Sequence, residues 1–146
     1  MISNAQEIEE QPEYLLTNFK VNIEKLAAMN RSFASLLLDR RCASCWGDIF
    51  QEPGQGINIE TLEHLKKIAT HCSNIPGFIQ SNSPVMEAVF RILIGNRNKA
   101  TTLKSIYESL HKRWSDPTNP RTPSLDKLYR MLLADTFYGI SQVSQR

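Results

Sequence analysis

The stretch PEYLLTNFKVNIEKLAAMNRSFASLLL, residues 12–38, sets the expectation for the fold. Apolar residues recur in it every three and four positions, a spacing that places them on one face of a helix. This heptad stripe consists of Leu16, Phe19, Ile23, Leu26, Asn30, Phe33 and Leu37. The pattern predicts a long helix from about Pro12 that faces the core of a bundle. A two-stranded coiled coil registered by the polar Asn30 is less favoured, because three heptads are few for an independent coiled coil.

The same helix can continue through RRCASCWGDIF, residues 40–50, where two of the three cysteines form a C-x-x-C pair. A second apolar stripe, offset by one residue from the first, consists of Ala34, Leu38, Cys42, Cys45 and Ile49. Cysteine is among the residues most often buried, where it serves as a small hydrophobic side chain. The stripe therefore favours cysteines of the core, with no metal and no cofactor.

Two other interpretations of the cysteines stay open. A zinc site would use Cys42, Cys45, His71 and Cys72. Neighbouring helical residues point about 100° apart, so His71 and Cys72 can share one ion only if their helix ends there. A thioredoxin-like redox pair is less favoured, because that motif needs a strand before it and a helix after it.

Capped amphipathic patterns predict four further helices, which begin near Asn58, Ser83, Thr101 or Thr102, and Thr122. No alternating run of apolar and polar residues predicts a strand. The predicted fold is all-α, a compact bundle of five to six helices with two small helical lobes as a variant. The domains are a polar tail at 1–11, an N-terminal helical lobe at 12–78 and a C-terminal basic helical lobe at 79–146.

The charge is distributed unevenly along the chain. The net charge is +2, but residues 1–60 carry five Lys/Arg against nine Asp/Glu, whereas residues 79–146 carry ten against five. The basic residues of the second half are Arg91, Arg97, Lys99, Lys104, Lys112, Arg113, Arg121, Lys127 and Arg130. They are candidate contacts to the phosphate backbone of a nucleic acid. The competing interpretation is an ordinary charged surface in water.

The sequence offers no catalytic signature. A glycine-rich phosphate loop, a nucleophile elbow and an H-E-x-x-H pair are all absent, so we expect no enzyme. The N-terminus lacks a secretory signal and the cysteine count is odd, which favours a cytoplasmic protein without a membrane segment.

In size, helix content and charge the chain is similar to the small helical subunits of large nucleoprotein complexes, including CRISPR effector small subunits. The likeness implies a non-enzymatic accessory subunit that contacts nucleic acid through its basic half and protein partners through its N-terminal lobe. One alternative is an interaction adaptor without nucleic acid. A further alternative is a winged-helix-like DNA-binding regulator.

Overall fold

A computed structural model describes residues 13–49, 60–115 and 121–143 of the chain. These segments contain seven α-helices and a small three-stranded sheet. The helices are α2 (Ile23–Ala28), α3 (Phe33–Asp39), α4 (Ala43–Ile49), α5 (Thr61–Thr70), α6 (Val85–Gly95), α7 (Leu103–Arg113) and α8 (Leu125–Leu133). The other elements are the 3-10 helices η1 (Glu13–Leu16) and η3 (Cys72–Asn74) and the strands β1 (Asn18–Val21), β2 (Thr101–Thr102) and β3 (Ile140–Gln142). None of the described helices combines the length and apolar character that crossing a bilayer requires.

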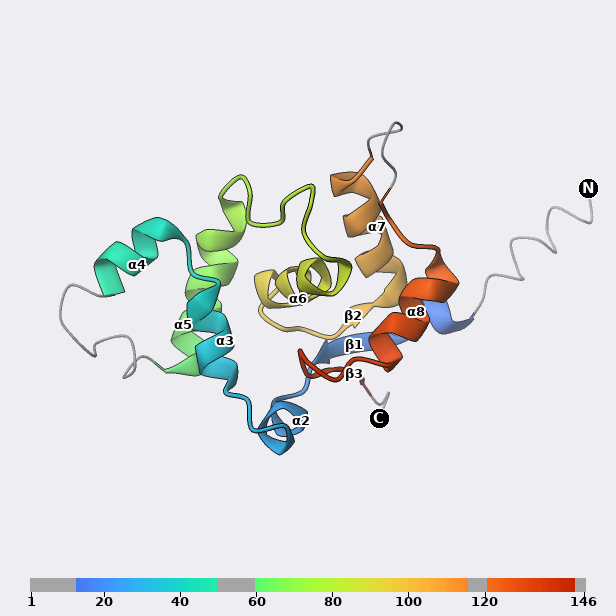
Figure 1. Cartoon of the computed structure of the whole chain (residues 1–146), viewed down its shortest axis with the longest axis horizontal. Helices are drawn as coiled ribbons and strands as arrows, with labels where there is room; N and C mark the ends of the chain where they lie inside the picture. The colour runs from blue at the N-terminus through green and yellow to red at the C-terminus, as the bar shows by residue number, and fades with distance from the viewer. Residues whose placement is uncertain (1–12, 50–59, 116–120, 144–146) are drawn as a thin grey trace, which may run out of the picture.

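Helix α6 lies at the centre of the molecule, over the sheet (Figure 1). Helices α3, α4 and α5 lie on one side of it, and α7 and α8 lie on the other. Five of its eleven residues are buried, and Phe90, Leu93 and Ile94 are among those with no exposed surface. Burial of each such side chain contributes about 1.5–3 kcal/mol. The two groups of helices therefore share one hydrophobic core.

The long helix predicted from residue 12 through the cysteines is wrong. The chain forms η1, β1 and the three short helices α2, α3 and α4 over that range. The Asn22 side chain accepts from the backbone N–H of Lys25 and starts α2, and the Ser32 hydroxyl accepts from Ser35 and starts α3. Between them Asn30 has a φ of 59°, a left-handed conformation that a helix cannot continue through. Local capping has thus overridden the heptad spacing.

The prediction that the chain has no sheet is also wrong. Strand β1 alternates, with Phe19 and Val21 buried and Lys20 exposed, in a run too short to stand out beside the heptad stripe. It is the central strand, antiparallel to both neighbours in the order β2-β1-β3. A mostly helical protein is confirmed, but a purely helical bundle is not. The proposed lobes at 12–78 and 79–146 stay a prediction. Strand β1 lies in the first range and pairs with β2 and β3 of the second.

The later helices agree better with the sequence. Thr102 caps α7 through its hydroxyl, as predicted, and Gly95 is the last residue of α6. The last helix begins later than predicted, because Ser124 and not Thr122 supplies the capping hydroxyl. The predicted cap at Asn58 lies outside the described residues.

A partly buried carboxylate joins three parts of the fold. Glu87 of α6 accepts two hydrogen bonds from Arg40, at 2.8 and 3.1 Å, and one from Arg91 at 2.7 Å. The Tyr138 hydroxyl also donates to it, at 3.0 Å. Burial alone would raise the pKa of Glu87, but the two guanidinium groups lower it. Burial and the Glu87 charge raise the pKa of Tyr138 to about 12. The carboxylate is therefore ionised and fixes the end of α3 and the Tyr138 loop against α6.

We expect Glu87→Gln to destabilise the fold by about 3 kcal/mol at pH 7, because two guanidinium groups lose their counter-charge. The folded-state pKa of Glu87 is lowered, so its contribution is complete above the usual glutamate range and is lost as the pH falls through the folded pKa. Urea unfolding should show that the difference in free energy of unfolding between wild type and Glu87→Gln is smaller at pH 3 than at pH 7. Glu63→Gln, at an exposed position of α5, is the matched control. Equal unfolding midpoints for both variants at pH 7 would contradict the assignment.

Candidate metal centre

The four residues Cys42, Cys45, His71 and Cys72 converge at the ends of two helices. Helix α3 ends at Asp39, and a turn brings Cys42 to the start of α4, where its carbonyl accepts from the backbone N–H of Trp46. Cys45 follows within the first turn of α4. Helix α5 ends at Thr70. The helical stripe that favours core cysteines is therefore interrupted before Cys42.

Residue His71 provides the break that the zinc interpretation requires. Its φ of −130° and ψ of −66° lie away from the regular helical values, and Cys72 begins a 3-10 turn. The Ser73 hydroxyl donates to the carbonyl of Ala69, and the Asn74 amide donates to that of Thr70. These bonds cap the end of α5. The imidazole of His71 and the thiol of Cys72 can therefore approach the same point.

Three distances between the ligand atoms are close to those of a tetrahedral site. The Cys45 and Cys72 sulfurs are 3.6 Å apart, and His71 Nδ1 lies 3.4 Å from the Cys42 sulfur and 3.7 Å from that of Cys45. All four atoms lie within 4.8 Å of one another. Tetrahedral zinc with bonds of about 2.3 Å to sulfur and 2.0–2.1 Å to nitrogen needs separations of about 3.8 and 3.6 Å. No disulfide is present, since the three cysteines are free.

The thiols differ in acidity when no metal is bound. Burial alone would raise the pKa of Cys42, but hydrogen bonds from the Ser44 side chain and the Cys45 backbone lower it to about 6. Burial raises the pKa of Cys72 to about 11. The backbone N–H of Cys42 points at the Cys72 sulfur, 3.3 Å away, and would stabilise a thiolate there. A bound divalent ion would deprotonate all three thiols.

A buried arginine precedes the first ligand. Arg41 is 8% exposed, and its Nη1 lies 2.8 Å from Nδ1 of His64, which is 1% exposed. An arginine can only donate, so this nitrogen of His64 is the acceptor of the bond. No pattern in the sequence distinguishes Arg41 from Arg40 or predicts its pairing with His64. The distant His111 stacks on Tyr107 at 5.8 Å and is outside the cluster.

The nine basic residues predicted to contact phosphates have different surroundings. Arg91 donates to Glu87 and to the carbonyl of Phe78, and Arg121 donates to carbonyls of Ser81 and Ser83. These two stabilise the fold. The exposed residues are Arg97, Lys99, Lys104, Lys112, Arg113, Lys127 and Arg130. Arg130 forms an ion pair with Asp126 at 3.0 Å.

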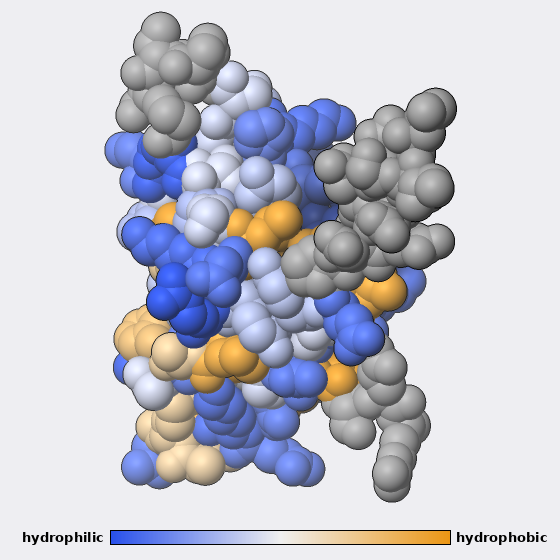
Figure 2. Space-filling model, turned by 90° about the vertical axis from the view of Figure 1, so that its right-hand side faces the viewer, coloured by the Kyte–Doolittle hydropathy of each residue, from blue (hydrophilic) through white to orange (hydrophobic). Residues whose placement is uncertain are grey.

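The face of the molecule that carries α8 has a mixed character. Figure 2 shows the side of the molecule that carries α8, where hydrophilic residues are interrupted by hydrophobic ones. The hydrophilic surface on this side is therefore not continuous.

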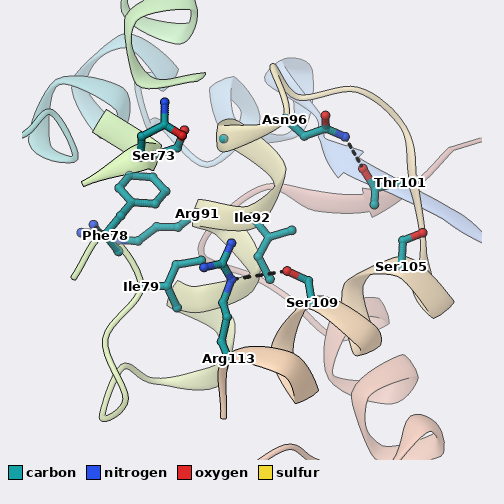
Figure 3. Close-up of a pocket in the computed structure, with 12 residues that line it drawn as sticks. Ser73, Phe78, Ile79, Arg91, Ile92, Asn96, Thr101, Ser105, Ser109 and Arg113 are labelled. Carbon is teal, nitrogen blue, oxygen red and sulfur yellow. Dashed lines mark hydrogen bonds between the residues drawn. The ribbon is translucent and has the colours of Figure 1, made fainter. Parts of the chain in front are cut away.

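A groove of about 340 Å³ lies between α6, α7 and the segment after η3 (Figure 3). Phe78, Ile79 and Ile92 form its apolar part, and Arg113 extends from α7 beside them. Its polar lining consists of Ser73, Asn74, Arg91, Asn96, Thr101, Ser105, Ser109 and Arg113. No acidic side chain lines it among the described residues, so its character favours an anionic ligand over a cationic one.

Metal-free protein at pH 7 should react with iodoacetamide first at Cys42, because a thiol with a pKa of about 6 is mainly thiolate there. Cys72, with a pKa of about 11 and no exposed surface, should react much more slowly. Mass spectrometry with peptide fragmentation measures the modification at each cysteine. The Cys42 rate should fall as the pH is lowered through 6. Modification of Cys72 before Cys42 would contradict this order.

Comparison with protein-family models, with curated proteins and with solved structures finds no significant match. The principal chemical feature of the described residues is the cluster of three thiols and one imidazole.

Proposed function

We propose that this chain is a zinc-binding protein with a structural site of three cysteines and one histidine. The observation that supports it is the convergence of Cys42, Cys45, His71 and Cys72 within 4.8 Å, with three of the separations close to those of tetrahedral zinc. Three thiolates and an imidazole are a donor set that zinc prefers over calcium or magnesium. The ligands must be reduced to bind, so the proposal also favours a reducing compartment such as the cytoplasm.

Four protein ligands point to a structural role and not to a catalytic one. A catalytic zinc keeps a position open for water or substrate, whereas four side chains complete the tetrahedron. A bound metal would be an additional source of stability for helix α4. It has only seven residues, lies at the periphery of the molecule (Figure 1), and buries only Cys45 and Ile49. An isolated helix of this length is marginal in water, so the metal would hold α4 against the end of α5.

Protein purified without chelator should contain one zinc ion per chain by elemental analysis. With free zinc at about 100 times its Kd, the metal should stabilise the fold by about 2.7 kcal/mol. Cys72→Ser and His71→Ala should lose the metal and this stabilisation. His111→Ala, which changes another exposed histidine, should keep both. Wild-type protein with far less than one zinc ion, or Cys72→Ser with an unchanged content, would contradict the proposal.

A second proposal is contact with nucleic acid, as an accessory subunit of a larger assembly. Seven of the nine candidate residues are exposed, which this role requires. Arg97 and Lys99 also lie on a fixed loop, because the Asn98 side chain accepts from the backbone N–H of Val21 and donates to its carbonyl. A preorganised loop loses little entropy on binding. Contacts of this kind hold the phosphate backbone and read no base sequence. Protein partners would bind through the N-terminal lobe.

One observation favours the winged-helix-like alternative. The elements α6, β2, α7, α8 and β3 follow the helix, strand, helix, helix, strand order of that class. The central strand, however, is β1, from the other end of the sequence. In this alternative α8 would be the recognition helix, with Lys127 exposed on it. If neither the Arg97/Lys99 loop nor helix α8 binds nucleic acid, the interaction adaptor without nucleic acid is the better interpretation.

Reversal of Arg97 and Lys99 to Glu should weaken binding to any single- or double-stranded sequence about tenfold or more and lower the salt slope by about two. Fluorescence anisotropy at two salt concentrations measures both effects. If Lys127→Glu weakens binding more, and for some sequences only, the winged-helix alternative takes precedence.

The control for this titration is the double reversal Lys66→Glu and Lys67→Glu, at exposed positions of α5. Lys25 is unsuitable as a control, because its Nζ donates to the carbonyls of Asp135 and Ile140 and stabilises the fold. Equal losses in the control and the Arg97/Lys99 variant would contradict a localised contact. Absence of binding by wild-type protein at low salt would leave the adaptor as the better interpretation.

A further inference from the structure

Arg41 is a buried charge, and none of the residues that the structure describes supplies it with a counter-charge. The ion pairs among the described residues join Arg40 and Arg91 to Glu87 and Arg130 to Asp126, and Arg41 takes part in none of them. Its Nε has no hydrogen-bond partner within the described segments. Its neighbour His64 supplies an acceptor nitrogen at 2.8 Å, which is not an anion. A buried guanidinium without an anion is costly, and such groups are normally paired.

Arg41 lines two hollows that members of the ligand cluster also line. One hollow of about 220 Å³ is lined by Arg41 together with Cys45 and His71. A second, also of about 220 Å³, is lined by Arg41 together with Cys42 and Cys72. The acidic residues of these hollows, Asp48 in the first and Asp39 in the second, are exposed and form no ion pair with Arg41.

Zinc binding would create the missing anion at this place. Three thiolates and a neutral imidazole around one divalent ion leave a net charge of about −1 on the centre. We infer that Arg41 is the counter-charge of this zinc-thiolate centre, positioned by its bond to His64. The inference rests on the proposed zinc site. It makes Arg41 a positioning residue that acts on the metal through the field at the thiolates, and not a ligand.

The inference predicts opposite effects on the metal-free and zinc-loaded proteins. Arg41→Met removes the charge and keeps much of the apolar stem. It should weaken zinc binding by about 10–100-fold, while the metal-free variant should be at least as stable as metal-free wild type, because an unpaired buried charge has gone. Arg41→Lys keeps the charge and should bind zinc within a few-fold of wild type. Lys67→Met, an exposed cation of the same hollow as Cys45, is the matched control and should change neither property.

Cobalt titration on the full chain, followed by zinc competition, measures the affinity through the absorption bands of the cobalt-thiolate centre. Urea unfolding with and without zinc measures the stability of each form. A role of Arg41 in packing alone predicts equal destabilisation with and without zinc and unchanged affinity, and this result would overturn the inference. If Arg41→Met does not fold, Arg41→Gln provides the same comparison.

The two proposals fail in different ways. Wild-type protein that binds neither zinc nor cobalt overturns the zinc site itself. Wild-type protein that binds zinc as tightly as Arg41→Met overturns only the role of Arg41.

Discussion

The ionised carboxylate of Glu87 is the constraint on which much of the arrangement depends. A carboxylate in a mostly buried place needs charged donors, and Arg40, Arg91 and Tyr138 supply them. Arg40 is the residue that ends α3, so its bond fixes where the following turn begins. Helix α6, which carries Glu87, also contacts α5 and η3. Both halves of the thiol and imidazole cluster are therefore positioned from the same central helix.

The sequence predicts the later helices well and the first part of the chain poorly, for one physical reason. Helices α6 and α7 have apolar faces that agree with their local signals, such as the Thr102 hydroxyl at the start of α7. Before residue 50 the signals conflict. The heptad stripe predicts one long helix, but Asn22, Asn30 and Ser32 lie in the same segment, and their side chains or backbone favour caps and turns. Strand β1 depends on partners far away in the sequence, and no local pattern encodes them.

The site was only partly predictable. The four ligands can be named from their types and spacing, but their convergence depends on the backbone of His71, where α5 ends. The two adjacent arginines show the same limit. Arg40 donates a hydrogen bond to the carboxylate of Glu87, and Arg41 donates one to the imidazole of His64. No pattern in the amino-acid sequence distinguishes the two arginines. Among the basic residues, Arg91 and Arg121 are used within the fold, which composition cannot reveal.

The pairing of β1 has a consequence for how the protein is made. Phe19 is synthesised well before its partners Thr101 and Gln142. The sheet cannot close until both partners have been made, and contacts of such long sequence separation slow folding. Until then Phe19 and Val21, which are fully buried in the finished fold, lack these neighbouring strands. The nascent chain thus presents a short apolar segment over the synthesis of more than a hundred residues, the kind of segment that chaperones protect from aggregation.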